Sequence, residues 1–449
     1  MLDLGRVTKS LGFKIFLVGI LILIMLIPVA LVVRVVHERA RRAEMVENEI
    51  VEAWGGTLSI AGPVMKVPCR RIEKFKKVDA DGHETIETRE VSFTLWITPS
   101  RMEINGDFVS SEKTRGIFSV PVFHGDLAFN GEFDTTDAFN ELKADEYPLP
   151  EEIEIILAIE NQKGIRSLKQ ASLGGQDIVF SPGDSGLNLL SGGIKAKAPL
   201  KTIENFKEPF NIGLTLQGGG QMTFLPLAGE TEVLLGSDWV APSYQGNYLP
   251  TEQSLDDDGF EAFWRISNLS RGIPLFWTGN LQEGGQFYNS FFGVDFLKVL
   301  DRYGKNERAV KYTILFIIVP FMTLFLFEVF WKMGIHPVQY ILAGTGNVIF
   351  YLLLLSLSEH MNFNLAYLIG ALAVTGMMFL YSTTLVREIK KALYMIPVMV
   401  LSYLYLFITL QSEDWALLIG SIGAFIIIGV IMFITRNVDW YGGRNRIDR

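Results

Sequence analysis

A carboxylate and an imidazole stand side by side at Glu359 and His360, directly after the apolar run YLLLLSLS at 351–358. In a membrane protein these two groups can relay protons or contribute to a metal site. The same residues can instead cap a helix where it leaves the bilayer and reaches water. The position of the bilayer along the chain decides between these two interpretations.

Two further polar side chains interrupt apolar stretches. Glu328 is the one carboxylate within a predicted membrane span, and such residues are rare and often functional. It lies four residues before Lys332, so the first expectation is a pair on one helix face that reaches the interface. Passage of ions or protons and hydrogen bonding to another helix are the alternatives. Asn347 follows Gly344 and Gly346, which are typical of close helix packing.

The sequence GDSG at 183–186 matches the nucleophile loop of trypsin-like proteases, and His83 and His124 precede it. It lacks the further glycine usual after that motif, and its proline and glycines favour a β-turn. Catalysis by Ser185 would need a triad, which is defined by geometry. We therefore interpret the motif as a turn and predict no catalytic residue.

No pattern in the sequence predicts a cofactor or a metal site. The run DDDG at 256–259 lacks the spacing of a helix-loop-helix calcium loop and is interpreted as a solvated turn. The glycines at 218–220 are not followed by the Lys-Ser/Thr of a phosphate loop. The five histidines and the single cysteine, Cys69, include no pair with zinc-ligand spacing.

Six apolar stretches can position these groups in a membrane, because a helix needs about 20 residues to cross the bilayer. They lie at 15–33, 312–331, 338–358, 361–386, 392–412 and 415–435. An Arg-rich helical pattern follows the first stretch in place of a small-residue cleavage site, which favours an uncleaved anchor over a signal peptide. Glu359 and His360 then lie at one end of the third span, about 30 Å from its start.

Basic residues in the short connections predict the orientation, since they mark the cytoplasmic side. On one side are Arg6, Lys9 and Lys14, then Lys332, then Arg387, Lys390 and Lys391, and finally Arg436, Arg444, Arg446 and Arg449. The opposite connections contain Glu359, His360, Glu413 and Asp414 and no Lys or Arg. Basic clusters at 34–42 and 302–311 flank a long domain, and long domains cross largely regardless of charge. Both termini are therefore predicted to be cytoplasmic.

Between the first and second spans the spacing of the apolar residues changes. Apolar residues recur every three or four positions over 36–54, which predicts a helix that ends at Gly55 and Gly56. Short alternating runs from residue 57 onward predict strands and turns. The predicted segments are a cytoplasmic N-terminus (1–11), a first transmembrane helix (12–34), a juxtamembrane stalk helix (35–56), a mainly-β periplasmic domain of one or two subdomains (57–308), a five-helix transmembrane bundle (309–435) and a cytoplasmic tail (436–449).

Charge and cysteine content narrow the class of partner. Residues 55–308 contain 24 Lys and Arg against 36 Asp and Glu, a net charge of −12 within a chain of net charge −9. This acidic middle argues against nucleic acid, because phosphate binding needs clustered basic residues. A single cysteine allows no intrachain disulfide and says nothing firm about the redox compartment.

Several motifs resemble one bacterial family. They are EVFWKMGIHPVQYILAGTGNVIFYLLLLSLSEHMNFNLAYL (328–368), SDWVAPSYQGNYLP (237–250), TRGIFSVPVF (114–123), GPVMKVP (62–68), ALLIGS (416–421) and TRNVDWYG (435–442). Together they are similar to the CreD family of inner-membrane proteins. The resemblance implies a cell-envelope integrity protein linked to a two-component response, colicin tolerance and susceptibility to cell-wall antibiotics. It implies no catalytic or ligand residue.

The motif at 237–250 provides a candidate recognition loop. Its polar and aromatic members are Asp238, Trp239, Tyr244 and Tyr248. Turn formation and core packing explain these residues as well as recognition does.

The sequence therefore predicts an α-helical membrane protein with six transmembrane helices, one N-terminal and five C-terminal, and a large inserted mainly-β periplasmic domain, a β-sandwich. The leading hypothesis is a non-enzymatic inner-membrane protein whose partners are membrane lipids and envelope components, with no cofactor and with oligomerisation left open. The alternative is transport of a lipid or small solute through polar groups at Glu328, Asn347, Glu359 and His360. A periplasmic hydrolase built on Ser185 is the remote alternative. A polar cavity through the helices would favour transport, whereas a closed apolar bundle would favour an anchor.

Overall fold

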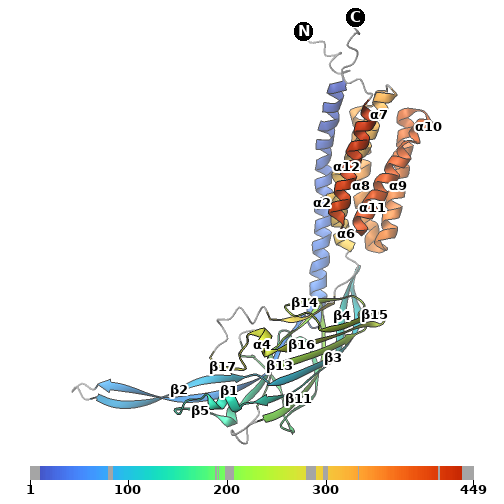
Figure 1. Cartoon of the computed structure of the whole chain (residues 1–449). Helices are drawn as coiled ribbons and strands as arrows, with labels where there is room; N and C mark the ends of the chain where they lie inside the picture. The colour runs from blue at the N-terminus through green and yellow to red at the C-terminus, as the bar shows by residue number, and fades with distance from the viewer. Residues whose placement is uncertain are drawn as a thin grey trace. The chain divides into compact units, whose positions relative to one another are not determined.

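The chain forms two compact units, residues 1–44 with 300–449 and residues 45–299 (Figure 1). The computed structural model describes residues 11–78, 84–187, 190, 192–197, 207–279, 290–296, 302–331, 333–412 and 415–436. The boundary at Met45 divides the predicted stalk segment, so that α2 (Leu11–Trp54) contributes its final turns to the second unit.

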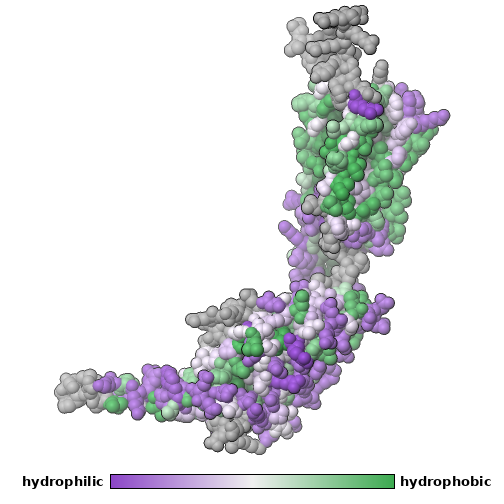
Figure 2. Space-filling model, in the orientation of Figure 1, coloured by the Kyte–Doolittle hydropathy of each residue, from purple (hydrophilic) through white to green (hydrophobic). Residues whose placement is uncertain are grey.

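The first unit is helical. Besides the first part of α2 it contains α6 (Arg302–Lys311), α7 (Thr313–Phe330), α8 (Pro337–His360), α9 (Phe363–Val386), α10 (Ile389–Ala392), α11 (Met395–Gln411) and α12 (Ala416–Thr435). Among the described residues, six helices are long and apolar enough to cross a membrane, one N-terminal and five C-terminal. Figure 2 shows hydrophobic side chains over the middle of this unit and hydrophilic ones toward its ends. The predicted fold class is confirmed.

Local signals set the ends of these helices. At the start of α8, His336 accepts a hydrogen bond from the Val338 amide, Gln339 reaches back to the His336 amide, and Pro337 occupies the first helical position. Asn362 caps α9 through its bond from the Leu365 amide. Arg387 ends α9 in the left-handed region, at φ 57°.

The core of the helical unit is aromatic. Phe350, Tyr351 and Phe321 are fully buried, and Phe350 and Tyr403 pack with ring centroids 4.6 Å apart. α8 lies against α7 and α9, and α11 lies against both of these helices. Only 6% of the α12 span is buried. α12 is therefore the most weakly packed of the six helices.

The second unit consists of two β-sheets. One has the strand order β14-β18-β12-β1-β6-β10-β9; in addition, β2 and β5 pair with β1, and β17 pairs with β2. The other has the order β15-β16-β13-β3-β4-β11-β7-β8. The strands of the first sheet are β1 (Leu58–Val78), β2 (Glu84–Ile97), β5 (Glu146–Pro148), β6 (Glu154–Ile159), β9 (Ser181–Gly183), β10 (Gly193–Lys197), β12 (Gln221–Leu225), β14 (Pro242–Gly246), β17 (Phe276–Thr278) and β18 (Phe292–Phe296). Those of the second sheet are β3 (Arg101–Arg115), β4 (Phe118–Asp134), β7 (Ile165–Leu173), β8 (Gln176–Asp177), β11 (Lys207–Gly219), β13 (Glu230–Ser237), β15 (Glu252–Asp256) and β16 (Gly259–Ser267).

The two sheets share one hydrophobic core. Successive side chains of a strand point to opposite faces, and β13 accordingly buries every second residue. Aromatic rings from the two sheets meet in the core: Phe123 of β4 lies 4.5 Å from Phe296 of β18, centroid to centroid. Trp264 of β16 has no exposed surface and packs edge-on against Tyr244 of β14. This is the packing of a β-sandwich.

The last turns of α2 pack onto β4. Ile50 and Val51 form a small core with Val120 and Val122. The helix ends where the amides of Gly55 and Gly56 both bond to the Val51 carbonyl, at 3.1 and 2.8 Å. A Cβ on Gly55 would lie 2.4 Å from the Gln217 carbonyl oxygen, so the close approach of β11 requires glycine there.

Candidate functional site

Glu328 receives three hydrogen bonds at the end of α7. Its side chain is 7% exposed and accepts bonds from Lys14 Nζ at 2.8 Å, from the Tyr340 hydroxyl at 3.1 Å and from the Ile335 amide at 3.3 Å. These donors come from α2, from α8 and from the segment between α7 and α8. Glu328 therefore takes part in bonding between helices. Lys332, the partner first expected from the sequence, lies outside the described residues.

Asn347 belongs to a second buried set in the middle of the helical unit. Its Nδ2 donates to the Ala343 carbonyl one turn earlier, at 3.1 Å, and its Oδ1 accepts from the Tyr403 hydroxyl at 3.3 Å. The Tyr367 hydroxyl donates to the Tyr403 carbonyl at 2.7 Å. These bonds join α8, α9 and α11. Polar groups satisfied in this way hold helices together in a membrane.

Glu359 belongs to a third set at the other end of α8. It is 10% exposed, lies 3.7 Å from Arg39 Nε of α2, and accepts a bond from the Tyr303 hydroxyl of α6 at 3.3 Å. Beside it, Asn306 donates to the Ser358 hydroxyl at 2.9 Å. His360 is exposed at the last residue of α8 and takes part in none of these contacts.

The four polar candidates are not brought together. Asn347 and Glu359 are twelve residues apart on α8, which corresponds to about 18 Å. Glu328 lies beyond the opposite end of that helix, bonded to Tyr340. Glu328, Asn347 and Glu359 are each bonded to side chains of neighbouring helices. Their hydrogen bonds and ion pairs hold α2, α6, α7, α8, α9 and α11 against one another.

One cavity of the helical unit is large and apolar. It has a volume of about 770 Å³ and lies between α7, α11 and α12. Most of its lining residues are aliphatic or aromatic, and none of the four polar candidates is among them. No sequence signal pointed to it, because the three helices read as ordinary apolar spans.

Asp238 and Trp239 of the candidate recognition loop hold the chain after β13. Asp238 Oδ1 accepts a bond from the Ser110 amide at 2.6 Å, which ties the loop to β3. Trp239 Nε1 donates to the Ala241 carbonyl at 2.8 Å. The indole is half-buried and packs against the sandwich core.

Tyr244 and Tyr248 also pack on that core. Tyr244 lies edge-on to Phe260 and to Trp264, and burial raises the pKa of its hydroxyl. Tyr248 lies edge-on to Phe292, and its hydroxyl donates to the Ser270 carbonyl at 3.3 Å. The aromatic residues of the loop therefore serve packing in this structure, and recognition by the loop stays a prediction.

Ser185 occupies a structural turn. Its hydroxyl donates to the Leu190 carbonyl at 2.8 Å and accepts from the Leu187 amide at 3.4 Å, and the side chain is buried. His124 lies on β4 of the other sheet, opposite Gln217, and His83 lies outside the described residues. Among the described residues, no group of three or more His, Cys, Asp and Glu could hold a metal ion. The acidic run at 256–259 forms the exposed turn between β15 and β16.

Arg271 is a charged residue that sequence reasoning missed. It is 5% exposed, and none of its three guanidinium nitrogens has a hydrogen-bond partner in the described part of the chain. Burial lowers its pKa to about 10, so it stays charged at neutral pH. Nothing in the surrounding sequence, SNLSRGIP, marks the residue as buried.

We expect Arg271→Met to stabilise the β unit. Replacing an unpaired buried charge by a hydrophobic side chain of similar length removes a desolvation penalty. Replacing a whole buried ion pair in this way can stabilise by about 1–4 kcal/mol, and we expect an effect within this range. Thermal unfolding of the full-length protein in detergent, followed by circular dichroism, would measure the effect. Arg265→Met is the matched control, because Arg265 is exposed and pairs with Glu232 at 2.9 Å. A lower melting temperature for Arg271→Met than for the control would contradict the expectation.

A family model and one known protein both match almost the whole chain. The family model described as inner membrane protein CreD matches residues 10–441. Inner membrane protein CreD of Escherichia coli K12 is 29% identical over 420 residues, which cover 94% of this chain and 91% of that protein.

Solved structures match only in part. An M1 zinc metallopeptidase from Deinococcus radiodurans has a TM-score of 0.21 at 9% identity, covering 37% of this chain and 38% of that one. Leukotriene A4 hydrolase from Saccharomyces cerevisiae also has a TM-score of 0.21, at 8% identity, covering 44% of this chain and 28% of that one. The chain thus spans less than two-fifths of either protein, and at this TM-score the likeness carries no argument about activity.

Proposed function

This chain belongs to the CreD family of inner membrane proteins, and on that premise we propose that it is a non-enzymatic protein of cell-envelope integrity. In this proposal the six helices anchor the protein, and the β unit lies in the periplasm and engages envelope components. The role in envelope stress and in tolerance of colicins or antibiotics is the one that the family resemblance implies.

The observation that carries the proposal is the internal bonding of the polar side chains in the bundle. Glu328, Asn347 and Glu359 are all bonded to neighbouring helices, and the large cavity is apolar. A path for ions or small polar solutes needs polar groups that face a shared, wet cavity. The arrangement therefore supports an anchor over a solute transporter, and the turn at Ser185 supports a role other than hydrolysis.

The orientation rests on charge. Arg387, Lys390 and Lys391 lie at the connection from α9 to α11, and Arg436 lies at the end of α12. Basic residues in short connections face the cytoplasm. The opposite end of α8 has Glu359 and His360. This assignment puts both termini in the cytoplasm and residues 45–299 in the periplasm.

Site-specific photocrosslinking in living cells tests the proposal. A photoreactive residue would replace Leu249 or Val240, which are 71% and 52% exposed on the β unit. We expect crosslinks to periplasmic or outer-envelope components, and none of these from a matched position at Lys390. Crosslinks from Leu249 and Val240 to cytoplasmic proteins only, or to no envelope component, would overturn the proposal.

A further inference from the structure

We propose that the groove between α7, α11 and α12 is a binding site for an anionic phospholipid. In this assignment an acyl chain fills the groove, and the phosphate lies at its mouth among basic side chains. The site is independent of the envelope role proposed above, since it concerns only the helical unit.

The length and the lining of the groove indicate the kind of occupant. Its lining runs along α7 from Leu315 to Phe330, a distance of about 22 Å at the helical rise. A long apolar groove of this kind suits an extended hydrocarbon chain.

Three polar side chains in the walls of the groove are already bonded to the helices. Thr323 and Ser402 donate to carbonyls of their own helices, Val319 and Val398, both at 2.8 Å. The Tyr405 hydroxyl donates to carbonyls at the start of α12, at 3.2 Å. Apart from the rings of Trp331 and Tyr394 at one end, most of the remaining surface is hydrocarbon, which water fills poorly and an acyl chain fills well.

One glycine of α12 shapes the groove. A Cβ on Gly423 would lie 2.3–2.5 Å from the ring and hydroxyl of Tyr405, so glycine lets α11 and α12 touch there. The lining continues along α12 from Gly423 to Ile434. The groove therefore extends from this contact toward the end of α12.

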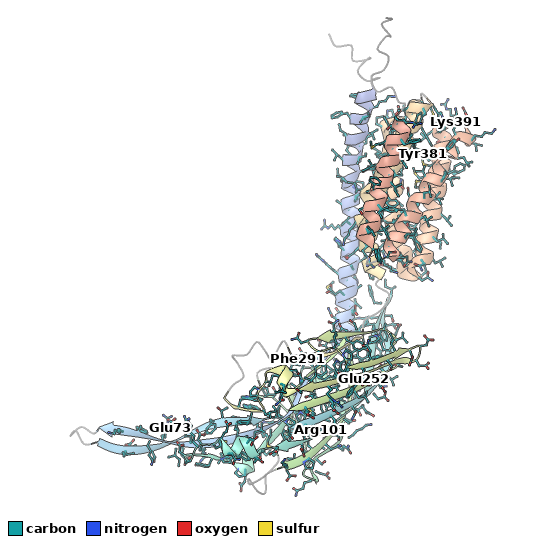
Figure 3. The ribbon with its side chains drawn as sticks, in the orientation of Figure 1. Glu73, Arg101, Glu252, Phe291, Tyr381 and Lys391 are labelled. Atoms are coloured by element: carbon teal, nitrogen blue, oxygen red, sulfur yellow. The ribbon has the colours of Figure 1, made fainter. Side chains whose placement is uncertain are left out.

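That end has the side chains of a phospholipid headgroup site. Trp331 and Tyr394 line the groove there with ring centroids 6.2 Å apart, and such rings are typical of the headgroup level. Lys391 Nζ lies 5.7 Å from the centre of the Trp331 ring, and Figure 3 shows Lys391 at this end of the helices. Arg436 directly follows α12.

The charge at this end of the helices is unbalanced. Lys391 is paired with Glu388 at 2.7 Å. Within the described residues, Arg387, Lys390 and Arg436 have no acidic partner within 4.0 Å. Basic pockets between membrane helices on the cytoplasmic side attract anionic headgroups. Charge complementarity and the apolar lining therefore both favour an anionic phospholipid.

Native mass spectrometry of the full-length protein tests the site. The protein would be released from nanodiscs that contain equal amounts of phosphatidylglycerol and phosphatidylcholine. We expect wild type to retain phosphatidylglycerol at least fivefold more than phosphatidylcholine. Ile427→Trp, which fills the groove, should lose the retained lipid, whereas Ile428→Trp, at an exposed position outside the lining, should keep it.

Variants that remove charge test binding of the headgroup separately from binding of the acyl chain. Lys390→Gln combined with Arg436→Gln should lower the ratio of retained phosphatidylglycerol to retained phosphatidylcholine toward one. Lys305→Gln, on α6, should leave that ratio unchanged. Equal retention of the two lipids by wild type would overturn the proposal. So would a protein dimer that Ile427→Trp abolishes, because the occupant would then be a second copy.

Discussion

Glu328→Ala should lower the stability of the helical unit more than any other single change at a polar site. It removes the acceptor of three hydrogen bonds and leaves the Lys14 ammonium without its partner. Breaking a buried ion pair costs about 3–5 kcal/mol, and we expect about 3 kcal/mol because the Lys14 side chain is 30% exposed. Unfolding in mixed micelles with increasing denaturing detergent would measure the loss.

A double variant tests whether the ion pair between Lys14 and Glu328 accounts for this loss of stability. Replacing both partners, with Lys14→Met and Glu328→Met, should recover part of the loss. A hydrophobic pair avoids the cost of an unpaired buried charge, whereas the Ile335 amide and the Tyr340 hydroxyl still lose their acceptor. A double variant as unstable as Glu328→Ala alone would show that the ion pair does not account for the effect. Envelope phenotypes of Glu328→Gln provide a second readout, which we expect to follow protein level rather than any transported solute.

Trp264→Ala should produce the largest loss in the β unit. The indole is fully buried, packs against Tyr244 and Phe292 from the facing sheet, and donates to the Tyr248 carbonyl at 3.2 Å. Truncating a buried Trp costs about 3–5 kcal/mol. Thermal unfolding of the full-length protein should show a lower unfolding temperature for the β unit, because Trp264 is fully buried in the shared core.

Two comparisons identify the source of the Trp264 effect. Trp264→Phe keeps a ring in the core and loses the hydrogen bond, so it should cost less than half as much as the alanine variant. Leu269→Ala, at a side chain that is 93% exposed, should change stability by less than about 0.5 kcal/mol. Equal losses for the alanine and phenylalanine variants would assign the effect to the hydrogen bond instead of to packing.

The spans were predictable because their signals are local. The run predicted at 338–358 became α8, which starts at the cap of His336 and Pro337, and the run predicted at 361–386 became α9 after its cap at Asn362. The alternating runs gave strands for the same reason. Pairing between distant strands has no local signal: β1 lies parallel to β12, with Leu58 opposite Met222. No spacing rule relates two such segments.

The sites were less predictable because their partners are remote. A helix-spacing rule directs Glu328 to Lys332, whereas the described partner, Lys14, is 314 residues away. The groove between α7, α11 and α12 accompanies the loose packing of α12, which is not marked by any sequence motif. The burial of Arg271 could not be predicted, because no sequence pattern distinguishes a buried arginine from an exposed one.

Cysteine chemistry permits a direct test of sidedness. The native Cys69 thiol is buried on β1, and burial together with the nearby Glu146 raises its pKa to about 11. It therefore has little thiolate at pH 7.5 and should not react with maleimides in the folded protein. A cysteine introduced at an exposed position can then be followed in the otherwise unchanged chain.

In the proposed topology, residues 45–299 lie outside the cytoplasmic membrane and the basic connections lie inside. The most direct measurement is labelling of intact cells with a membrane-impermeant maleimide, after the outer membrane alone is permeabilised. A cysteine in place of Asp257, in the exposed turn between β15 and β16, should be labelled, and one in place of Lys390 should be labelled only after lysis. Labelling at Lys390 with protection at Asp257 would contradict the account.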